Sequence, residues 1–257
     1  MGILNVTPDS FSDGGCFANG NAALAQGALL AREGADIVDI GGESTRPGHT
    51  PLAAEEEQAR AIPTVKALAR QLSVPISIDT YKASTARLAL AAGARIINDV
   101  WGLQRDPEIA SVAAAHGAPV IVMHNRASAD PDLDIVDEMR RYFEVSLAIA
   151  RRAGIPDSHV VLDPGIGFGK TAFQHLEAIR RLPEIRALGF PVMVGISRKS
   201  LLGRIASRAT EPRDRLHASI AAHVLAASLG ADIVRVHDVA PHVEALRVVD
   251  TIMRRAS

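Results

Sequence analysis

Short apolar runs alternate with longer Ala- and Leu-rich stretches along the whole chain. Six of the longer stretches have helical spacing and end at a glycine, and an apolar run follows at once. Glycine favours the left-handed conformation that ends a helix, while short uninterrupted apolar runs are typical of strands buried on both faces of a parallel sheet. The pentapeptide GADIV occurs at two of these junctions, which indicates a repeated unit. The runs predicted as strands are 35–40, 95–98, 119–123, 160–163, 191–194 and 231–236.

Two further apolar runs bring the predicted strands to eight. Residues 3–4 form the first, and residues 75–78 follow a helix predicted over 63–72. Eight strands that alternate with helices predict an α/β fold, a TIM (β/α)8 barrel, as a single domain over residues 1–257. An open doubly wound sheet also alternates, but it usually has fewer strands and a glycine-rich turn after the first strand. Here residues 5–8 read Asn-Val-Thr-Pro, so the barrel is favoured.

Polar residues follow the predicted strands, whereas the opposite strand ends are joined mainly by Gly and Ala. In a TIM barrel the carboxyl ends of the strands meet on one face, and the active sites of barrel enzymes lie there. A purely structural barrel has no reason to keep polar side chains on one face, so this pattern predicts an enzyme. The polar residues concerned are Asn5, 43–46, Asp79, Asn98, Asp99, His124, Asn125, Asp163, 197–199, Arg235, His237 and Asp238.

Composition and charge exclude several classes of partner. The 28 Lys and Arg against 29 Asp and Glu give a formal net charge of -1, so neither a nucleic-acid surface nor a polybasic membrane anchor is expected. Aromatic residues are 4% of the chain, which disfavours stacking on single-stranded nucleic acid, and no apolar run approaches a membrane span. The single Cys16 excludes an internal disulfide, and the first residues lack a signal-peptide pattern. A cytoplasmic enzyme with small-molecule substrates is therefore expected.

Seven motifs along the chain resemble those of one enzyme family. The first, MGILNVTPDSFSDGG over residues 1–15, resembles the opening signature of the dihydropteroate synthases. The others follow in the family's order: GGESTRPG (41–48), SIDT (77–80), IND (97–99), LDPGIGFGK (162–170), GISRKS (195–200) and RVHDV (235–239). The resemblance implies a pterin-binding TIM-barrel transferase of folate biosynthesis and a sulfonamide target. Such an enzyme condenses 4-aminobenzoate with 6-hydroxymethyl-7,8-dihydropterin diphosphate, giving 7,8-dihydropteroate and pyrophosphate.

A pterin ring has an amino group, ring nitrogens and a carbonyl along its edge, so its recognition calls for carboxylates, an amide and a cation. Four strand ends supply this set, and the resemblance assigns it to the pterin pocket. The alternative for Asp79 is that it caps the helix that follows it. The residues expected to bind the pterin are Asp79, Asn98, Met123, Asp163, Gly167, Phe168, Lys199 and Arg235.

The departing diphosphate requires donors that are already in place when its negative charge grows. Arginine offers a fork that matches phosphate oxygens, and a histidine ring nitrogen can donate as well. The residues expected to bind the diphosphate are Asn5, Thr45, Arg46, Arg235 and His237.

The resemblance also implies a magnesium ion, held by the side-chain oxygens of Asn5 and Asp13. Hard oxygen ligands and retained waters are what this ion prefers. The alternative for Asn5 is a turn residue before Pro8.

The aminobenzoate slot is expected to be formed by the ring of Phe11, by Pro47 and by the stem of Lys199, with Ser200 binding the carboxylate. The alternative for Phe11 is core packing. These parts imply a dissociative displacement, in which pyrophosphate leaves first and the amine then captures a pterin cation. The residues expected to carry the reaction are Asp79, Asp163, Lys199, Arg235 and His237.

Two other functions share part of this pattern. A methyltransferase that passes a methyl group from methyltetrahydrofolate to a corrinoid needs a pterin pocket but no diphosphate donors. The other alternative is a non-catalytic pterin-binding or scaffold protein that has lost activity, but every polar position named above is intact. Apolar helical faces over Ile220–Leu229 and Val243–Ile252 further predict a homodimer, whereas Glu55–Glu57 indicate an acidic first turn of a helix and no site.

Overall fold

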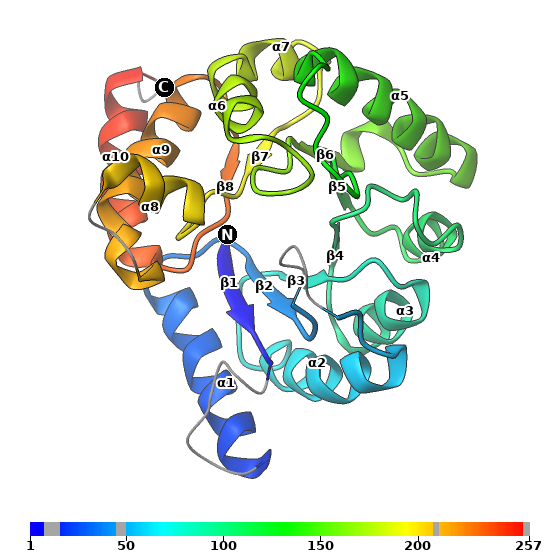
Figure 1. The fold of residues 1–257 in the computed structure, drawn as a ribbon. Coiled ribbons are helices and arrows are strands. Elements are labelled where there is room, and N and C mark those ends of the chain that lie inside the picture. Colours follow the sequence, from blue (N-terminus) through cyan, green and yellow to red (C-terminus); the bar gives the residue numbers. More distant parts are fainter. Residues whose placement is uncertain (8–15, 45–49, 208–210, 254–257) are drawn as a thin grey trace.

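The computed structural model describes residues 1–7, 16–44, 50–207 and 211–253. Strands gather at the centre of the molecule and helices surround them (Figure 1). Six strands form one parallel sheet in chain order, and two more form a parallel pair. The strands are β1 (Gly2–Asn5), β2 (Val38–Gly41), β3 (Ile76–Asp79), β4 (Ile96–Asp99), β5 (Val120–Met123), β6 (Val160–Asp163), β7 (Met193–Val194) and β8 (Ile233–Val234).

Two bridges join the six-stranded sheet to the pair and complete the ring. Leu162 of β6 lies opposite Val192, which precedes β7, and Gly2 of β1 lies opposite Val236, which follows β8. The amide of Leu162 donates to the carbonyl of Pro191 at 2.9 Å, and the amide of Ile3 donates to that of Val236 at 2.9 Å. The predicted α/β barrel with eight strands is confirmed.

Helices follow the strands around the ring and cover its outside (Figure 1). The long helix α5 shows how the sequence sets their limits. The side chain of Asp134 accepts from the amides of Val136 and Asp137 at its start, and Gly154 ends it with φ of 90°. The helices are α1 (Cys16–Arg32), α2 (Ala54–Leu68), α3 (Ala83–Ala92), α4 (Ile109–Ala115), α5 (Ile135–Ala153), α6 (Ala172–Arg180), α7 (Leu182–Arg186), α8 (Ser200–Ala206), α9 (Leu216–Ser228) and α10 (Val239–Met253), with 3-10 turns at Asp157–His159 and Pro212–Arg215.

Some predicted boundaries are wrong for identifiable reasons. The strands predicted over 35–40 and 231–236 begin later, because the residue after each glycine still bonds back to the preceding helix, as Ala35 does to the carbonyl of Leu30 at 3.0 Å. The helix predicted over 63–72 begins at Ala54 and continues through Pro63. Its buried face of Ala61, Val65 and Leu68 offsets the hydrogen bond that proline cannot donate.

Alternation along the strands separates two sets of side chains. Residues such as Val38, Ile40, Ile97 and Val120 point outward into the core that the helices cover. Met1, Ile121 and Met193 belong to a separate small cluster, packed with inward-facing residues of other strands. Inward-facing positions nearer the carboxyl ends are largely polar. Among the described helices, none combines the length and the apolar character needed to cross a membrane.

Phe143 in α5 is fully buried in the main core, whereas Val145 in the same helix is 50% exposed. We expect Phe143→Ala to lower the free energy of unfolding by about 3–5 kcal/mol, because it removes a large apolar group and leaves a cavity. Val145→Ala should change it by less than about 0.5 kcal/mol. Urea denaturation followed by circular dichroism measures both, and equal effects of the two substitutions would contradict this packing.

Candidate active site

The strand register places polar side chains from neighbouring strands at one level of the barrel. Asn5 pairs with Gly41, Gly41 with Asp79, and Asp79 with Asn98, so these four residues of β1 to β4 form one row. The side chains of Asn5, Asp79 and Asn98 share the inward face, because the residues that flank them in each strand pack outward. Since strand pairing alone sets this alignment, residues far apart in sequence converge at the carboxyl end of the barrel.

Arg235, directly after β8, crosses the barrel to this row. Its Nε donates to Oδ2 of Asp39 at 2.6 Å, and its terminal nitrogen donates to Oδ2 of Asp79 at 2.7 Å. The side-chain amide of Asn98 donates to the same Oδ2 of Asp39 at 3.1 Å. Among the described residues, Oδ1 of Asp39 and Oδ1 of Asp79 are buried and have no hydrogen-bond partner. Two acceptors therefore remain for the donors of a ligand.

Burial and charge pairing act against each other in this group. Burial raises the pKa of Asp79 to about 7, although the neighbouring Arg235 favours its charged form. Burial by itself would lower the pKa of Arg235, but Asp39 and Asp79 raise it above its usual value. Arg235 is thus a fixed cation, and Asp79 titrates close to neutral pH.

A second cation, Lys199, follows β7, and its side chain lies against the glycine-rich segment that follows β6. Its Nζ donates to the carbonyl of Ile166 and lies 4.6 Å from the ring centre of Phe168. Gly167 has φ of 96°, and a Cβ there would lie 2.8 Å from Cδ of Lys199, so only glycine fits beneath this side chain. Burial lowers the pKa of Lys199 to about 8, against the opposing charge of Asp163.

Hydrogen bonds fix the shape of the glycine-rich segment itself. Oδ1 of Asp163 accepts from the amide of Gly165 at 2.7 Å. The buried Nζ of Lys170 donates to the carbonyls of Gly165, Phe168 and His124 at 3.0, 3.1 and 3.3 Å. Burial lowers the pKa of Lys170 well below its usual value. The segment is held as a rigid platform, with Phe168 packed against a cluster that contains Met123.

Between β7 and β8, short polar contacts join the two strand ends. The amide of His237 donates to Oγ of Ser197 at 3.1 Å, and its Nδ1 lies 3.0 Å from the same oxygen. The guanidinium of Arg198 pairs with the carboxylate of Asp238, with Nε at 2.9 Å from Oδ2. Ser200 is exposed at the first position of α8. His237 and Lys199 are thereby presented on the same side of the barrel mouth.

The structure brings together the predicted residues that it describes: Asn5, Asp79, Asn98, Met123, Asp163, Gly167, Phe168, Lys199, Ser200, Arg235 and His237 lie at the carboxyl ends of the strands or just beyond them. The helix-cap alternative for Asp79 is wrong, because Oδ2 of Asp106 accepts from the first amide of α3, that of Ala83, at 2.7 Å. The turn alternative for Asn5 is also wrong, because Asn5 is the last residue of β1. Phe11, Asp13, Thr45, Arg46 and Pro47 lie outside the described residues.

Sequence reasoning missed Asp39, which is fully buried and holds both Arg235 and Asn98. The signal was present, since Asp39 is a charged residue inside an otherwise apolar strand. For Glu57 the sequence predicts only an acidic first turn of a helix. It is buried, and its Oε2 accepts from Nζ of Lys82 at 2.9 Å and from Thr85 at 3.1 Å. Lys82 also pairs with Glu43, so these residues tie the end of β2 to the end of β3.

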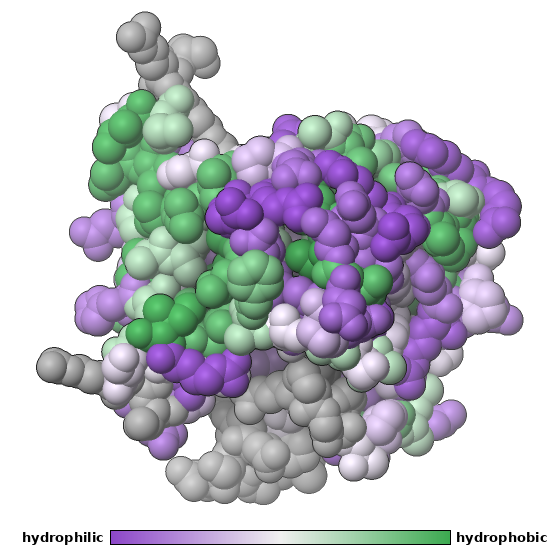
Figure 2. Space-filling model, turned by 45° about the horizontal axis from the view of Figure 1, so that its top comes forward, coloured by the Kyte–Doolittle hydropathy of each residue, from purple (hydrophilic) through white to green (hydrophobic). Residues whose placement is uncertain are grey.

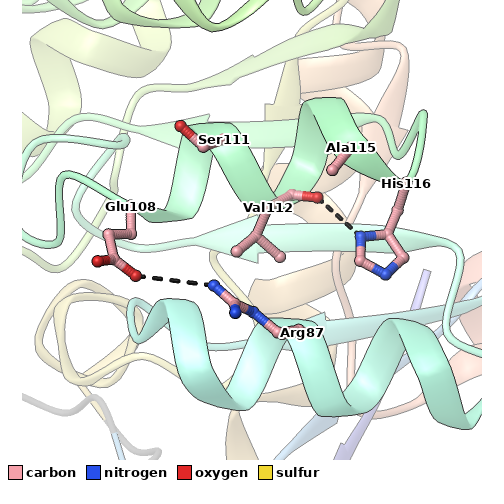
Figure 3. A pocket seen from close by; sticks show the side chains of 6 residues that line it. All are labelled: Arg87, Glu108, Ser111, Val112, Ala115 and His116. Atoms are coloured by element: carbon pink, nitrogen blue, oxygen red, sulfur yellow. Dashed lines mark hydrogen bonds and ion pairs between the residues drawn. The ribbon is translucent and has the colours of Figure 1, made fainter.

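The hollow drawn in Figure 3 is separate from this site. It has a volume of about 590 Å³ and lies between the outer helices α3 and α4, where Arg87 faces Glu108 at 3.7 Å. It is open to solvent and lined by the sides of two surface helices. The convergent polar side chains, and not this hollow, therefore define the candidate site.

Comparison with known proteins relates the chain to one group of enzymes. The sequence profile of the family described as "Pterin binding enzyme" matches residues 1–237. A dihydropteroate synthase from Synechocystis sp. is 46% identical over 260 residues, which cover 99% of this chain and 90% of that relative.

Solved structures give the same relation. A dihydropteroate synthase from Clostridium difficile, solved in the presence of pteroic acid, is 48% identical with a TM-score of 0.96, and the match covers 99% of this chain and 96% of that one. The Xanthomonas albilineans enzyme in complex with 7,8-dihydropteroate is 42% identical with a TM-score of 0.91, covering 100% and 94% of the two chains.

Asp39→Asn removes one of the two charges that hold Arg235 in the barrel. We expect the free energy of unfolding to fall by about 1.5–3 kcal/mol, the usual contribution of a hydrogen bond to a charged group. Asp36→Asn, three residues earlier at an exposed position, is the matched control and should change it by less than about 0.5 kcal/mol. Urea denaturation measures the free energy of unfolding of both variants. An Asp39→Asn protein as stable as the native protein would show that the pairing of Asp39 with Arg235 contributes little.

Proposed function

The chain belongs to the dihydropteroate synthase family and is a transferase of folate biosynthesis; from this premise we propose that its barrel mouth carries out the condensation as one active site, in the cytoplasm. The substrates are 6-hydroxymethyl-7,8-dihydropterin diphosphate and 4-aminobenzoate, and the products are 7,8-dihydropteroate and pyrophosphate. The observation that carries the proposal is the group formed by Asp39, Asp79, Asn98 and Arg235, facing Asp163 and Lys199 across the mouth.

The donors and acceptors of the pterin edge match this group. Asp79 and Asp163 accept from the amino group and ring N–H groups, Asn98 both donates and accepts, and Lys199 donates to the carbonyl. The ring then lies against Met123 and Phe168 above the glycine-rich segment, with the plane of Arg235 stacked on its other side. Glycine at 167 supports this placement, because a side chain there would occupy the space of Lys199.

The reaction begins with breakage of the bond between the pterin methylene carbon and the diphosphate oxygen. The diphosphate leaves with the electron pair, and a cation delocalised over the methylene and the pterin ring remains. The carboxylates of Asp79 and Asp163 stabilise this cation. The aminobenzoate nitrogen then forms a bond to the methylene carbon and releases one proton to solvent, so no strong general base is needed.

The departing diphosphate is met by Arg235 and His237, together with Thr45 and Arg46. Asn5 would hold a magnesium ion with its side-chain oxygen, and Asp13 is the second ligand proposed. A magnesium site with few protein ligands fits this place, because the ion usually keeps waters and binds substrate phosphates. Among the described residues, no three His, Cys, Asp or Glu side chains are grouped around a possible metal position. When bound, the ion neutralises charge on the diphosphate.

The aminobenzoate slot is proposed between Phe11, Pro47 and the stem of Lys199, with Ser200 at its carboxylate. Lys199 then contacts both substrates, its ammonium the pterin and its methylene groups the second ring. Its place over Phe168 and beside Gly167 supports this double role.

Pyrophosphate release tests the proposal directly. We expect release only when both the pterin diphosphate and aminobenzoate are present, competitive inhibition by a sulfonamide against aminobenzoate, and loss of activity with a chelator that added magnesium restores. Release without aminobenzoate would point to hydrolysis, and undiminished release without divalent metal would remove the magnesium site. Methyl transfer to a corrinoid from methyltetrahydrofolate, in place of pyrophosphate release, would support the methyltransferase instead.

Lys199→Ala should lower kcat/KM by about tenfold to a hundredfold, because a charge-assisted hydrogen bond in a buried site is lost. In the native enzyme kcat/KM should also fall as pH rises through about 8, since Lys199 then loses the proton that it donates. Lys199→Arg should be a poor enzyme but lack this alkaline fall, because its guanidinium stays protonated. Lys66→Ala, exposed on α2, is the control. Near-native constants in both Lys199 variants would remove this residue from the site.

We also propose that the enzyme is a homodimer. Apolar side chains gather on the part of the surface formed by α8, α9 and α10, toward the left of Figure 2. Those exposed by about half or more are Ile205, Leu225, Val248, Ile252 and Met253. A contiguous apolar surface of this kind is typical of an interface between subunits.

Light scattering should give twice the chain mass of 27.2 kDa at micromolar concentration. Leu225→Glu should shift the protein toward the monomer, because it places a charge in the interface. Val145→Glu, on α5 and equally exposed, should leave the mass unchanged. A native protein of monomer mass would end this proposal.

A further inference from the structure

Two buried histidines lie directly behind the candidate site, and the proposed reaction assigns them no role. His223 in α9 is fully buried, and His242 in α10 is 2% exposed. Nδ1 of His223 lies 3.0 Å from Nε2 of His242, with the ring planes at 71°. The two rings form the polar contact between α9 and α10 at the level of the strand ends.

The contacts at the two ends of this pair determine where each proton lies. The backbone amide of Ile196 points at Nε2 of His223 at 3.2 Å. Because an amide can only donate, Nε2 carries no proton, and a neutral His223 must carry its proton on Nδ1. That proton faces Nε2 of His242, which must accept it. His242 then carries its own proton on Nδ1 and donates to the carbonyl of Asp238 at 2.6 Å.

Each hydrogen bond in this series therefore points the same way, from Ile196 through both rings to Asp238. A further proton on either ring would place two donors face to face. Burial lowers the pKa of His223 to about 3, and the neighbouring His242 lowers it further. Burial likewise lowers the pKa of His242.

The series ends on the two segments that carry catalytic side chains. Ile196 lies three residues before Lys199, and Asp238 follows His237. Between them, Arg198 pairs with the carboxylate of Asp238, and the amide of Arg198 donates to Oγ of Ser219 at 2.9 Å. The end of β7 is thus held from α9 and α10 at several points.

The conformation of Arg198 shows why such support is needed. Its φ of 59° is left-handed, which is unfavourable for a residue with a side chain. This turn directs the next residue, Lys199, over Phe168 toward the carbonyl of Ile166. A left-handed Arg198 persists only where its surroundings hold the backbone on both sides, and Ile196 is held by His223.

We propose that His223 and His242 are a positioning pair that fixes the end of β7 against the end of β8 and so aims Lys199 at the substrates. This rests on the proposed function of Lys199. Neither histidine touches a substrate; both act through the backbone. The alternative is that the two rings only fill space between α9 and α10, in which case apolar side chains of similar size would serve as well.

Nitrogen NMR of the native protein labelled at its histidines tests the arrangement without relying on activity. Two neutral rings with the proton on Nδ1 are expected, whereas free histidine prefers the proton on Nε2. The signals of His223 should stay unchanged between pH 8 and pH 5. A proton on Nε2 of His223 would overturn the proposal, because Nε2 then cannot accept from Ile196.

Paired substitutions test the positioning role. His223→Leu keeps the bulk and removes the hydrogen bonds, and should lower kcat/KM by about tenfold. His223→Gln offers an acceptor and a donor at similar spacing and should restore kcat/KM to within about threefold of the native value. His242→Leu combined with His223→Leu should cost no more than either alone, because the series is already broken. His217→Leu, exposed on the same helix, is the control.

Coupling to Lys199 separates positioning from general stability. In a Lys199→Ala background, His223→Leu should have almost no further effect on kcat/KM, because there is no ammonium left to aim. Equal, additive losses in both backgrounds would overturn the proposal. If the native protein released no pyrophosphate, the proposed function would fail. The positioning proposal could still be tested, because calorimetry would measure pteroic acid binding to the native protein, to the two single variants and to the double variant.

Discussion

The buried pairing of Arg235 with Asp39 and Asp79 is the interaction on which the arrangement of the barrel mouth depends. A guanidinium inside a barrel is unfavourable unless its donors are met, and here two carboxylates from neighbouring strands meet them at 2.6 and 2.7 Å. The contact ties β8 to β2 and β3 across the interior, where strand pairing alone does not reach. It also leaves one oxygen of each carboxylate without a partner among the described residues. The group that stabilises the closed ring is therefore also one prepared to receive a ligand.

The mouth divides into two sides of different chemistry. The side formed by β1 to β4 offers oxygen acceptors and the amide of Asn98, and the side from β6 to β8 offers the cations Lys199 and Arg235 and the ring of His237. In the proposed reaction the flat pterin bridges the two sides, with its leaving group directed toward the cations. Buried polar contacts support each side. Lys82 pairs with Glu43 and Glu57 behind the first side, and Lys170 donates to the glycine-rich segment of the second side from beneath.

Much of the fold and part of the site follow from local pattern. The eight strands and the polar residue just after each one are visible because periodicity and helix-ending glycines are properties of neighbouring residues. Asp39 was not predicted as a site residue, because its role depends on Arg235, 196 residues away in sequence. Glu57 looked like an ordinary helix start for the same reason, since Lys82 comes from another element. The histidine pair had no local signature at all, because the two rings meet only through the packing of α9 against α10.

The charges at the mouth suit a cationic intermediate better than a neutral one. Asp39, Asp79 and Asp163 contribute three carboxylates, and Arg235 and Lys199 contribute two cations. Lys170 lies beneath the glycine-rich segment, where its Nζ donates to three carbonyl groups. Among these five side chains, with the carboxylates ionised, one negative charge is in excess, and a pterin cation formed by departure of diphosphate would neutralise it. Burial raises the pKa of Asp79 to about 7 and so disfavours its charged form. A cation that forms beside Asp79 therefore stabilises this buried carboxylate more than it would in water. Preorganised charge of this kind requires a fixed frame, which the buried Arg235 and the hydrogen-bonded segments around it provide.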